Sequence, residues 1–165
     1  MQLPKRKQIR LKDYDYSQDG YYFITMCTKD KRKLLCDIVG TGILDGPQIK
    51  FTEYGEIANQ QIEIMTDFYD DIKINKYVVM PNHIHMLIEI IRSDDGPSGT
   101  PVPTNSKISN FVGTFKRFCN KLYGKNIWQY RSYDHIIRGE EDYKEIWQYI
   151  DKNPTKWKED KFYTE

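Results

Sequence analysis

The 165-residue sequence contains few cysteines, few histidines and no long apolar run. Its three cysteines, Cys27, Cys36 and Cys119, form no CxxC pair, and their odd number argues against a disulfide framework. No stretch approaches the roughly 18 apolar residues of a membrane span, and the basic segment Met1–Lys7 lacks the apolar core of a signal peptide. We therefore expect a single soluble domain in a reducing cytoplasm, with no membrane partner.

A net charge of +1 conceals an uneven distribution of charge. Residues 1–33 hold nine Lys/Arg and four Asp/Glu, and residues 101–131 hold six Lys/Arg and no acidic residue. Residues 53–95 hold three Lys/Arg and nine Asp/Glu. A polyanion would be attracted to the first two segments, where neutralised phosphates give salt-dependent affinity. A solvated surface without a ligand is the simpler interpretation of either run taken alone.

The residue patterns predict one α+β domain over residues 1–165. Apolar periodicity and turn residues predict strands at 21–27, 34–39, 43–44, 48–51, 72–80 and 83–91, an extended segment at 127–138, and helices at 53–68, 107–123 and 139–153. The basic, tyrosine-containing segment 1–19 suits a single strand of nucleic acid, and the Gly/Pro/Ser-rich segment 92–106 predicts a flexible linker loop. This order of elements predicts a ferredoxin-like antiparallel sheet with helices packed on it.

The apolar run Val78–Ile90 is interrupted mainly by Pro81, Asn82 and two histidines. Alternate side chains of a strand point the same way, so His83 and His85 are expected to share one face. Two imidazoles held two residues apart on a rigid strand can bind one divalent metal ion. The alternative is that both histidines are simply surface residues on the polar face of a half-buried strand.

A Pro-Asn pair followed by His-hydrophobic-His in a strand resembles the HUH motif of the single-tyrosine transposases, which cut and rejoin single-stranded DNA. The segments that follow are Trp128-Gln129, Asp134-His135-Ile136-Ile137-Arg138 and Tyr149-Ile150-Asp151-Lys152-Asn153-Pro154. Their order resembles the REP-associated tyrosine transposases, a mostly bacterial branch, from about Lys7 to Trp157. The resemblance implies the HUH endonuclease fold and a metal-dependent single-stranded DNA endonuclease and transesterase. It also implies hairpin-forming repeats as the DNA partner, on nucleoid-associated DNA in the cytoplasm.

The same resemblance implies a role for four side chains. His83 and His85 match the HUH histidines, Tyr149 matches the nucleophile, and Asn153 matches the polar residue that completes the metal site. Tyr149 and Asn153 are four residues apart in a predicted helix, hence on one face. Magnesium or manganese would act as a Lewis acid on the scissile phosphate, and two nitrogen ligands suit manganese better. Attack by the phenol would leave a 5′-phosphotyrosine and a free 3′-hydroxyl.

Other polar residues have supporting roles in this interpretation. His135 either supports the active site or orients its strand through a hydrogen bond. The residues expected to contact the DNA backbone are Lys5, Arg6, Lys7, Arg10, Lys116, Arg117 and Lys121.

Alternative functions are a binding module that recognises a DNA or RNA hairpin without cutting it, and another class of HxH enzyme. The joint presence of His83, His85, Tyr149 and Asn153 argues against the first, although Tyr149 is one of 13 tyrosines. Two-histidine phosphoesterases need a second HxT or HxS motif, and histidine-triad hydrolases need a third histidine where this chain has Leu87. Whether the protein acts as a monomer or as a homodimer with shared active sites is left open.

Overall fold

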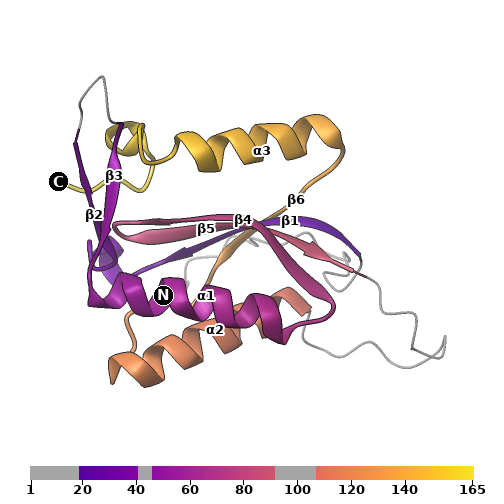
Figure 1. The fold of residues 1–165 in the computed structure, drawn as a ribbon, viewed down its shortest axis with the longest axis horizontal. Coiled ribbons are helices and arrows are strands. Elements are labelled where there is room, and N and C mark those ends of the chain that lie inside the picture. The colour runs from indigo at the N-terminus through magenta and orange to yellow at the C-terminus, as the bar shows by residue number, and fades with distance from the viewer. Residues whose placement is uncertain (1–18, 41–45, 92–106) are drawn as a thin grey trace, which may run out of the picture.

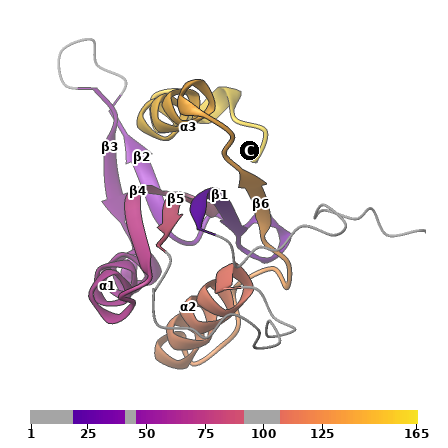
Figure 2. The ribbon, with the colours of Figure 1, turned by 90° about the vertical axis from the view of Figure 1, so that its right-hand side faces the viewer.

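Four antiparallel strands form the central sheet, in the order β4-β5-β1-β6. The strands are β1 (Gly20–Cys27), β4 (Ile72–Met80), β5 (His83–Ile90) and β6 (Tyr133–Ile136). Helices α1 (Glu53–Phe68) and α2 (Lys107–Tyr123) cover one face of this sheet, and α3 (Glu140–Lys152) lies on the other (Figures 1 and 2). The strand order and connections are ferredoxin-like, as the sequence predicts.

This computed structural model describes residues 19–40, 46–91 and 107–165. The basic N-terminal segment except Asp19, the strand expected at 43–44 and the linker expected at 92–106 lie outside the described residues. In the part of the chain that the structure describes, we find no helix with both the length and the apolar character that a membrane crossing requires.

The larger part of the core lies between the sheet and the α1/α2 layer. It contains Tyr22, Ile24, Ile84 and Met86 from the two central strands, packed with apolar side chains of both helices such as Phe115. The smaller part lies under α3, where Phe23, Val78 and Leu87 pack with Ile150 and Trp157. Because alternate residues of β1 and β5 enter opposite layers, both faces of these central strands are covered.

A two-stranded sheet of β2 (Cys36–Val39) and β3 (Gln48–Phe51) lies beside the main sheet. The sequence predicts both strands. Its turn residues Asp45-Gly46-Pro47 favour a hairpin of 43–44 with 48–51, whereas the structure pairs 48–51 with β2. The register places Cys36 opposite Phe51 and Ile38 opposite Ile49, so apolar side chains meet across the pair.

The extended segment expected at 127–138 is only partly a strand. It forms β6 over four residues, and Trp128 adds an isolated bridge to Thr28. Two short 3-10 helices, η1 (Lys29–Lys31) and η2 (Trp157–Glu159), complete the described elements. The second brings the segment after α3 back toward the start of β5.

Candidate active site

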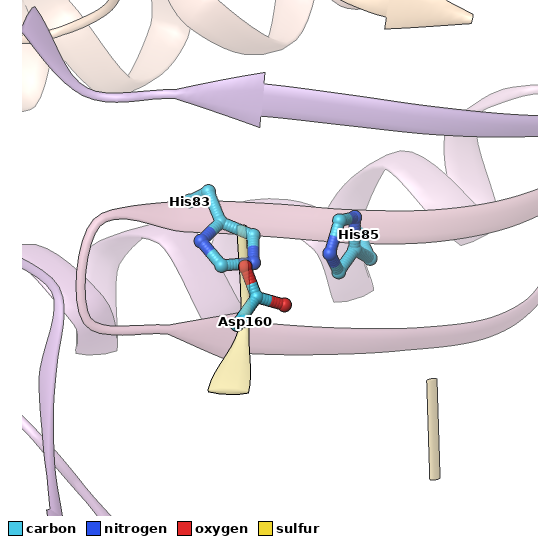
Figure 3. Close-up of side chains that lie close together, drawn as sticks. All are labelled: His83, His85 and Asp160. Carbon is cyan, nitrogen blue, oxygen red and sulfur yellow. The ribbon is translucent and has the colours of Figure 1, made fainter. Parts of the chain in front are cut away.

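His83 and His85 lie side by side on β5 and face the layer of α3 (Figure 3). Their ring centroids are 4.4 Å apart. They share one face, as predicted, yet both side chains have an exposed fraction of 0%. The segment after α3 covers them, with the Phe162 ring centroid 4.7 Å from that of His83. The histidines are therefore buried polar groups rather than surface residues.

Hydrogen bonds to the Nδ1 atoms orient both imidazoles. His83 Nδ1 lies 2.8 Å from Asn82 Oδ1, and His85 Nδ1 lies 2.8 Å from Thr25 Oγ1. The Asn82 amide is itself fixed, because its Nδ2 donates to the carbonyl oxygens of Lys31 and Phe162. Asn82 Oδ1 can only accept, so His83 carries its proton on Nδ1 and presents the lone pair of Nε2.

Burial also keeps both imidazoles neutral. It is the main cause that lowers the pKa of His83, and it lowers the pKa of His85, with a further lowering from the neighbouring His83. A neutral imidazole is the form that binds metal ions, so both rings are ready to act as ligands near pH 7.

Asn153 and Asp160 bring oxygen atoms to the two imidazoles. Ligand atoms of His83, His85 and Asp160 all lie within 4.8 Å of one another (Figure 3). Asn153 Nδ2 donates to Asp160 Oδ2 at 3.0 Å. The other amide atom, Asn153 Oδ1, is buried. Within the described residues, neither Asn153 Oδ1 nor His83 Nε2 has a hydrogen-bond partner. A divalent cation would satisfy both orphaned atoms, so the residues present fit a metal ion bound by two nitrogens and two oxygens.

Asp160 is the residue that the sequence analysis missed. It lies beyond Pro154, outside the helix that carries Tyr149 and Asn153, and no spacing rule links it to the histidines. An acidic residue shortly after the Asn-Pro pair is the one signal that could have indicated it.

Tyr149 places its hydroxyl at the edge of this group. The hydroxyl oxygen is 3.4 Å from His85 Nε2, and it donates to Asp160 Oδ2 at 3.1 Å. Its ring packs edge-on against Phe23, at a centroid distance of 5.9 Å, and its side chain keeps 37% of its surface exposed. Burial, followed by the Asp160 carboxylate, raises the pKa of Tyr149 to about 12. The structure thus brings together all four residues expected at the active site: His83, His85, Tyr149 and Asn153.

The residues expected to contact DNA are placed differently. Lys116, which was expected to contact the DNA backbone, is buried. Its Nζ donates to the carbonyl oxygen of Gln129 at 2.8 Å, and burial lowers the pKa of Lys116 to about 8. Arg117 and Lys121 are exposed on α2, on the face of the sheet opposite Tyr149. The remaining expected residues, Lys5, Arg6, Lys7 and Arg10, lie outside the described residues.

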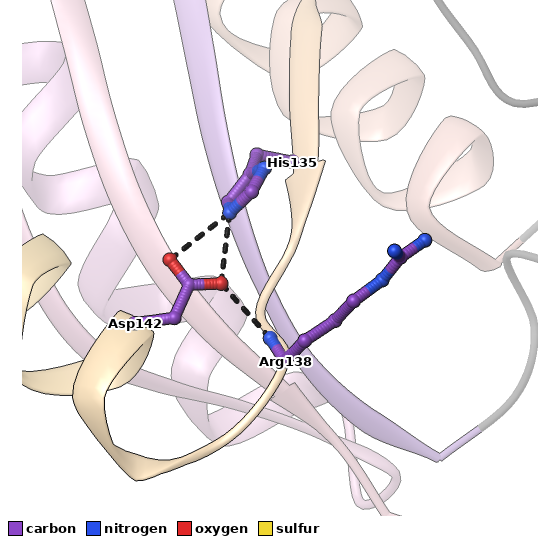
Figure 4. A network of polar contacts seen from close by, with 3 residues as sticks. All are labelled: His135, Arg138 and Asp142. Atoms are coloured by element: carbon purple, nitrogen blue, oxygen red, sulfur yellow. Dashed lines mark hydrogen bonds and ion pairs between the residues drawn. The ribbon is translucent and has the colours of Figure 1, made fainter.

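His135 connects β6 to the first turn of α3 (Figure 4). Its Nε2 lies 3.1 and 2.9 Å from the two carboxylate oxygens of Asp142, and the backbone N–H of Arg138 donates to the same carboxylate at 2.9 Å. Burial acts to raise the pKa of Asp142, but these hydrogen bonds outweigh it and lower that pKa. This is the geometry of a histidine that orients its strand, the second of the two roles considered for it.

Proteins of Haemophilus influenzae and Escherichia coli are similar to this chain in sequence. No protein-family model matches the sequence. An uncharacterized protein of Haemophilus influenzae is 34% identical over an alignment of 175 positions, which covers 97% of this chain and 94% of that protein. The REP-associated tyrosine transposase of Escherichia coli K12 is 28% identical over 141 residues, which cover 86% of this chain and 70% of the relative.

A second named relative and a solved structure are also similar to this chain. A putative REP-associated tyrosine transposase of H. influenzae is 25% identical over 147 residues, covering 86% of this chain and 74% of that protein. A solved REP-associated tyrosine transposase bound to a REP hairpin matches with a TM-score of 0.62 at 24% identity, over 90% of this chain and 73% of that chain. The two chains thus share the fold. In sequence, the chain is therefore related to the REP-associated tyrosine transposases.

Proposed function

We propose that the protein is a metal-dependent single-stranded DNA endonuclease and transesterase that acts through a covalent 5′-phosphotyrosine. One observation carries this proposal: the Tyr149 hydroxyl lies 3.4 Å from His85 Nε2, at the edge of a group of potential metal ligands. A nucleophile beside donors that can hold a divalent cation is the arrangement that phosphoryl transfer to a side chain requires.

In this proposal Tyr149 is the nucleophile and Asp160 accepts its proton. The Tyr149 oxygen would form a bond to phosphorus while the bond from phosphorus to the 3′-oxygen breaks, and the departing oxygen gains a proton. Because the Tyr149 phenol is protonated near pH 7, its proton must leave as it attacks. Asp160 Oδ2 already accepts a hydrogen bond from this hydroxyl and is placed to receive that proton.

A divalent cation held by His83, His85, Asn153 and Asp160, magnesium or manganese, would supply a Lewis acid for the scissile phosphate. The phosphotyrosine retains the energy of the broken phosphodiester, so a 3′-hydroxyl can later displace Tyr149 and rejoin strands. No separate energy source is needed for that second step.

The DNA partner that we propose is a hairpin-forming repeat with a single-stranded flank. The name of the E. coli relative and the hairpin bound in the solved transposase support this substrate class. Cleavage would take place at or near the hairpin, where unpaired backbone can bend toward Tyr149.

The decisive experiment incubates the protein with Mn²⁺ and DNA hairpins with varied flanks, then detects a protein–DNA adduct on a denaturing gel. Tyr149→Phe and His83→Ala should abolish the adduct, with folding confirmed by circular dichroism. Tyr143→Phe is the matched control, because Tyr143 lies on the same helix and packs against Tyr21, at a centroid distance of 5.0 Å. Tight hairpin binding without an adduct, for every flank and metal tested, would instead make the protein a binding module.

A further inference from the structure

A pocket of about 540 Å³ opens to solvent beside α3. Its lining includes Tyr149 together with Asn153 and Asp160, the two residues that bring oxygen atoms to the histidines. Both histidines are fully buried under the segment that follows α3. The pocket therefore gives a substrate a route to the nucleophile and to the oxygen ligands from the side of α3.

The formal charges around this pocket balance. Its charged lining residues are Lys152, Lys156, Lys161, Glu145, Glu159 and Asp160. A general excess of positive charge therefore does not explain how a phosphate would be drawn into it. If a phosphate binds here, individual lysines must hold it.

Lys161 differs from the other two lysines in how its ammonium group is held. The Nζ atom lies 5.3 Å from the ring centroid of Tyr133 and 5.0 Å from that of Phe162. Two cation–π contacts restrict the side chain without neutralising it. Within residues 19–40, 46–91 and 107–165, no carboxylate forms an ion pair with this ammonium group, so its charge is available to an anion.

Lys161 also lies close to the metal-ligand group. It follows Asp160 directly in the chain, and the Phe162 ring that it contacts packs on His83. Its charge is among the causes that lower the pKa of both His83 and His85, after burial. Lys161 also lines the same pocket as Tyr149, Asn153 and Asp160, and a reacting phosphate has to enter that pocket to reach Tyr149.

We propose that Lys161 binds a non-bridging oxygen of the scissile phosphate and orients that phosphate for attack by Tyr149. This inference rests on the proposed function and names the residue that receives the substrate. The lysine supplies a point charge and hydrogen-bond donors to a group whose negative charge grows in the transition state.

The proposal predicts effects of opposite sign when the charge is removed. Lys161→Gln should weaken the binding of single-stranded DNA, because a charge-assisted hydrogen bond to phosphate is lost. The same change should strengthen Mn²⁺ binding severalfold, because a like charge near the cation is removed. A lysine that only supported the local structure would, when replaced, weaken both.

The test uses the full chain as wild type, Lys161→Gln, Lys161→Arg and the matched control Lys158→Gln. Lys158 is an exposed lysine of the same segment, and it is not among the residues that line this pocket. Isothermal titration calorimetry measures the affinity for Mn²⁺ alone. Fluorescence anisotropy measures the affinity for a short unpaired oligonucleotide, and the denaturing gel gives the rate of adduct formation.

We expect Lys161→Gln to lose roughly tenfold or more in oligonucleotide affinity and adduct rate, to bind Mn²⁺ more tightly, and to be rescued by Lys161→Arg. Equal behaviour of Lys161→Gln and Lys158→Gln would overturn the proposal, and so would a joint loss of DNA and metal affinity. If the wild type forms no adduct, the proposed function fails. The opposite shifts in DNA and Mn²⁺ affinity would still support the phosphate site in that case.

Discussion

Mild acid should destabilise the metal-free protein, because His83 and His85 are buried as neutral imidazoles. Burial is the main cause that lowers the pKa of each histidine below 6.5, the value expected in the unfolded chain. Between the folded and the unfolded pKa, unfolding takes up protons, so the free energy of unfolding falls as the pH falls. This contribution to stability is fully present above about pH 6.5 and is lost on acidification.

The size of the effect follows from the number of buried imidazoles. Each one contributes a slope of up to about 1.4 kcal/mol per pH unit once the unfolded state is protonated. Integrated from about pH 6.5 to about pH 5.5, the two histidines together remove about 2 kcal/mol. That is a large part of a typical domain stability of about 5–15 kcal/mol.

Urea denaturation with EDTA present, repeated across this pH range, measures the effect. His83→Gln keeps a neutral polar side chain at the position and should roughly halve the pH dependence. A free energy of unfolding that does not change between these pH values would refute the argument. So would a His83→Gln variant with the full pH dependence of the wild type.

Further predictions concern packing, a strand contact and the metal ligands. Gly55→Ala should lower the free energy of unfolding by about 2 kcal/mol or more, because its Cβ would overlap the carbonyl oxygen of Leu35. Gly113→Ala, which meets no atom within 4 Å, should instead raise it by up to about 1 kcal/mol; equal effects in urea denaturation would contradict the packing. Asp142→Ala should cost about 1 kcal/mol, seen as a lower Tm in calorimetry, by removing hydrogen bonds that connect β6 to α3. Asp160→Asn should weaken Mn²⁺ binding by roughly tenfold or more in calorimetric titration, and an unchanged affinity would exclude Asp160 as a ligand.

Local sequence patterns predicted the features of the fold that depend on residues near one another in the chain. The helix predicted at 53–68 is α1, and Thr52 accepts a hydrogen bond from the Gly55 N–H as its N-cap. The shared face of His83 and His85 follows from the geometry of a strand alone. The shared helix face of Tyr149 and Asn153 likewise follows from their spacing of four residues in a helix.

Features that depend on distant segments were not predictable in this way. The covering of His83 depends on where the segment after α3 returns, and no spacing in the sequence encodes that path. Lys116 illustrates the same limit, because a lysine on a helix is expected to be exposed. It is buried here because the carbonyl oxygen of Gln129, from a separate segment, accepts its hydrogen bond.

The hydrogen bond from Asn82 to the Phe162 carbonyl joins residues 80 positions apart, whereas β4 and β5 are joined by a tight turn. Contacts between distant residues require a long loop to close, so they form later in folding than a local hairpin does. The segment after α3 also carries few buried side chains. We therefore expect it to detach from the domain at a lower free energy than the sheet needs to open. On warming, the group of His83, His85, Asn153 and Asp160 should therefore come apart before the domain unfolds, and the protein would keep its fold after losing the proposed active site.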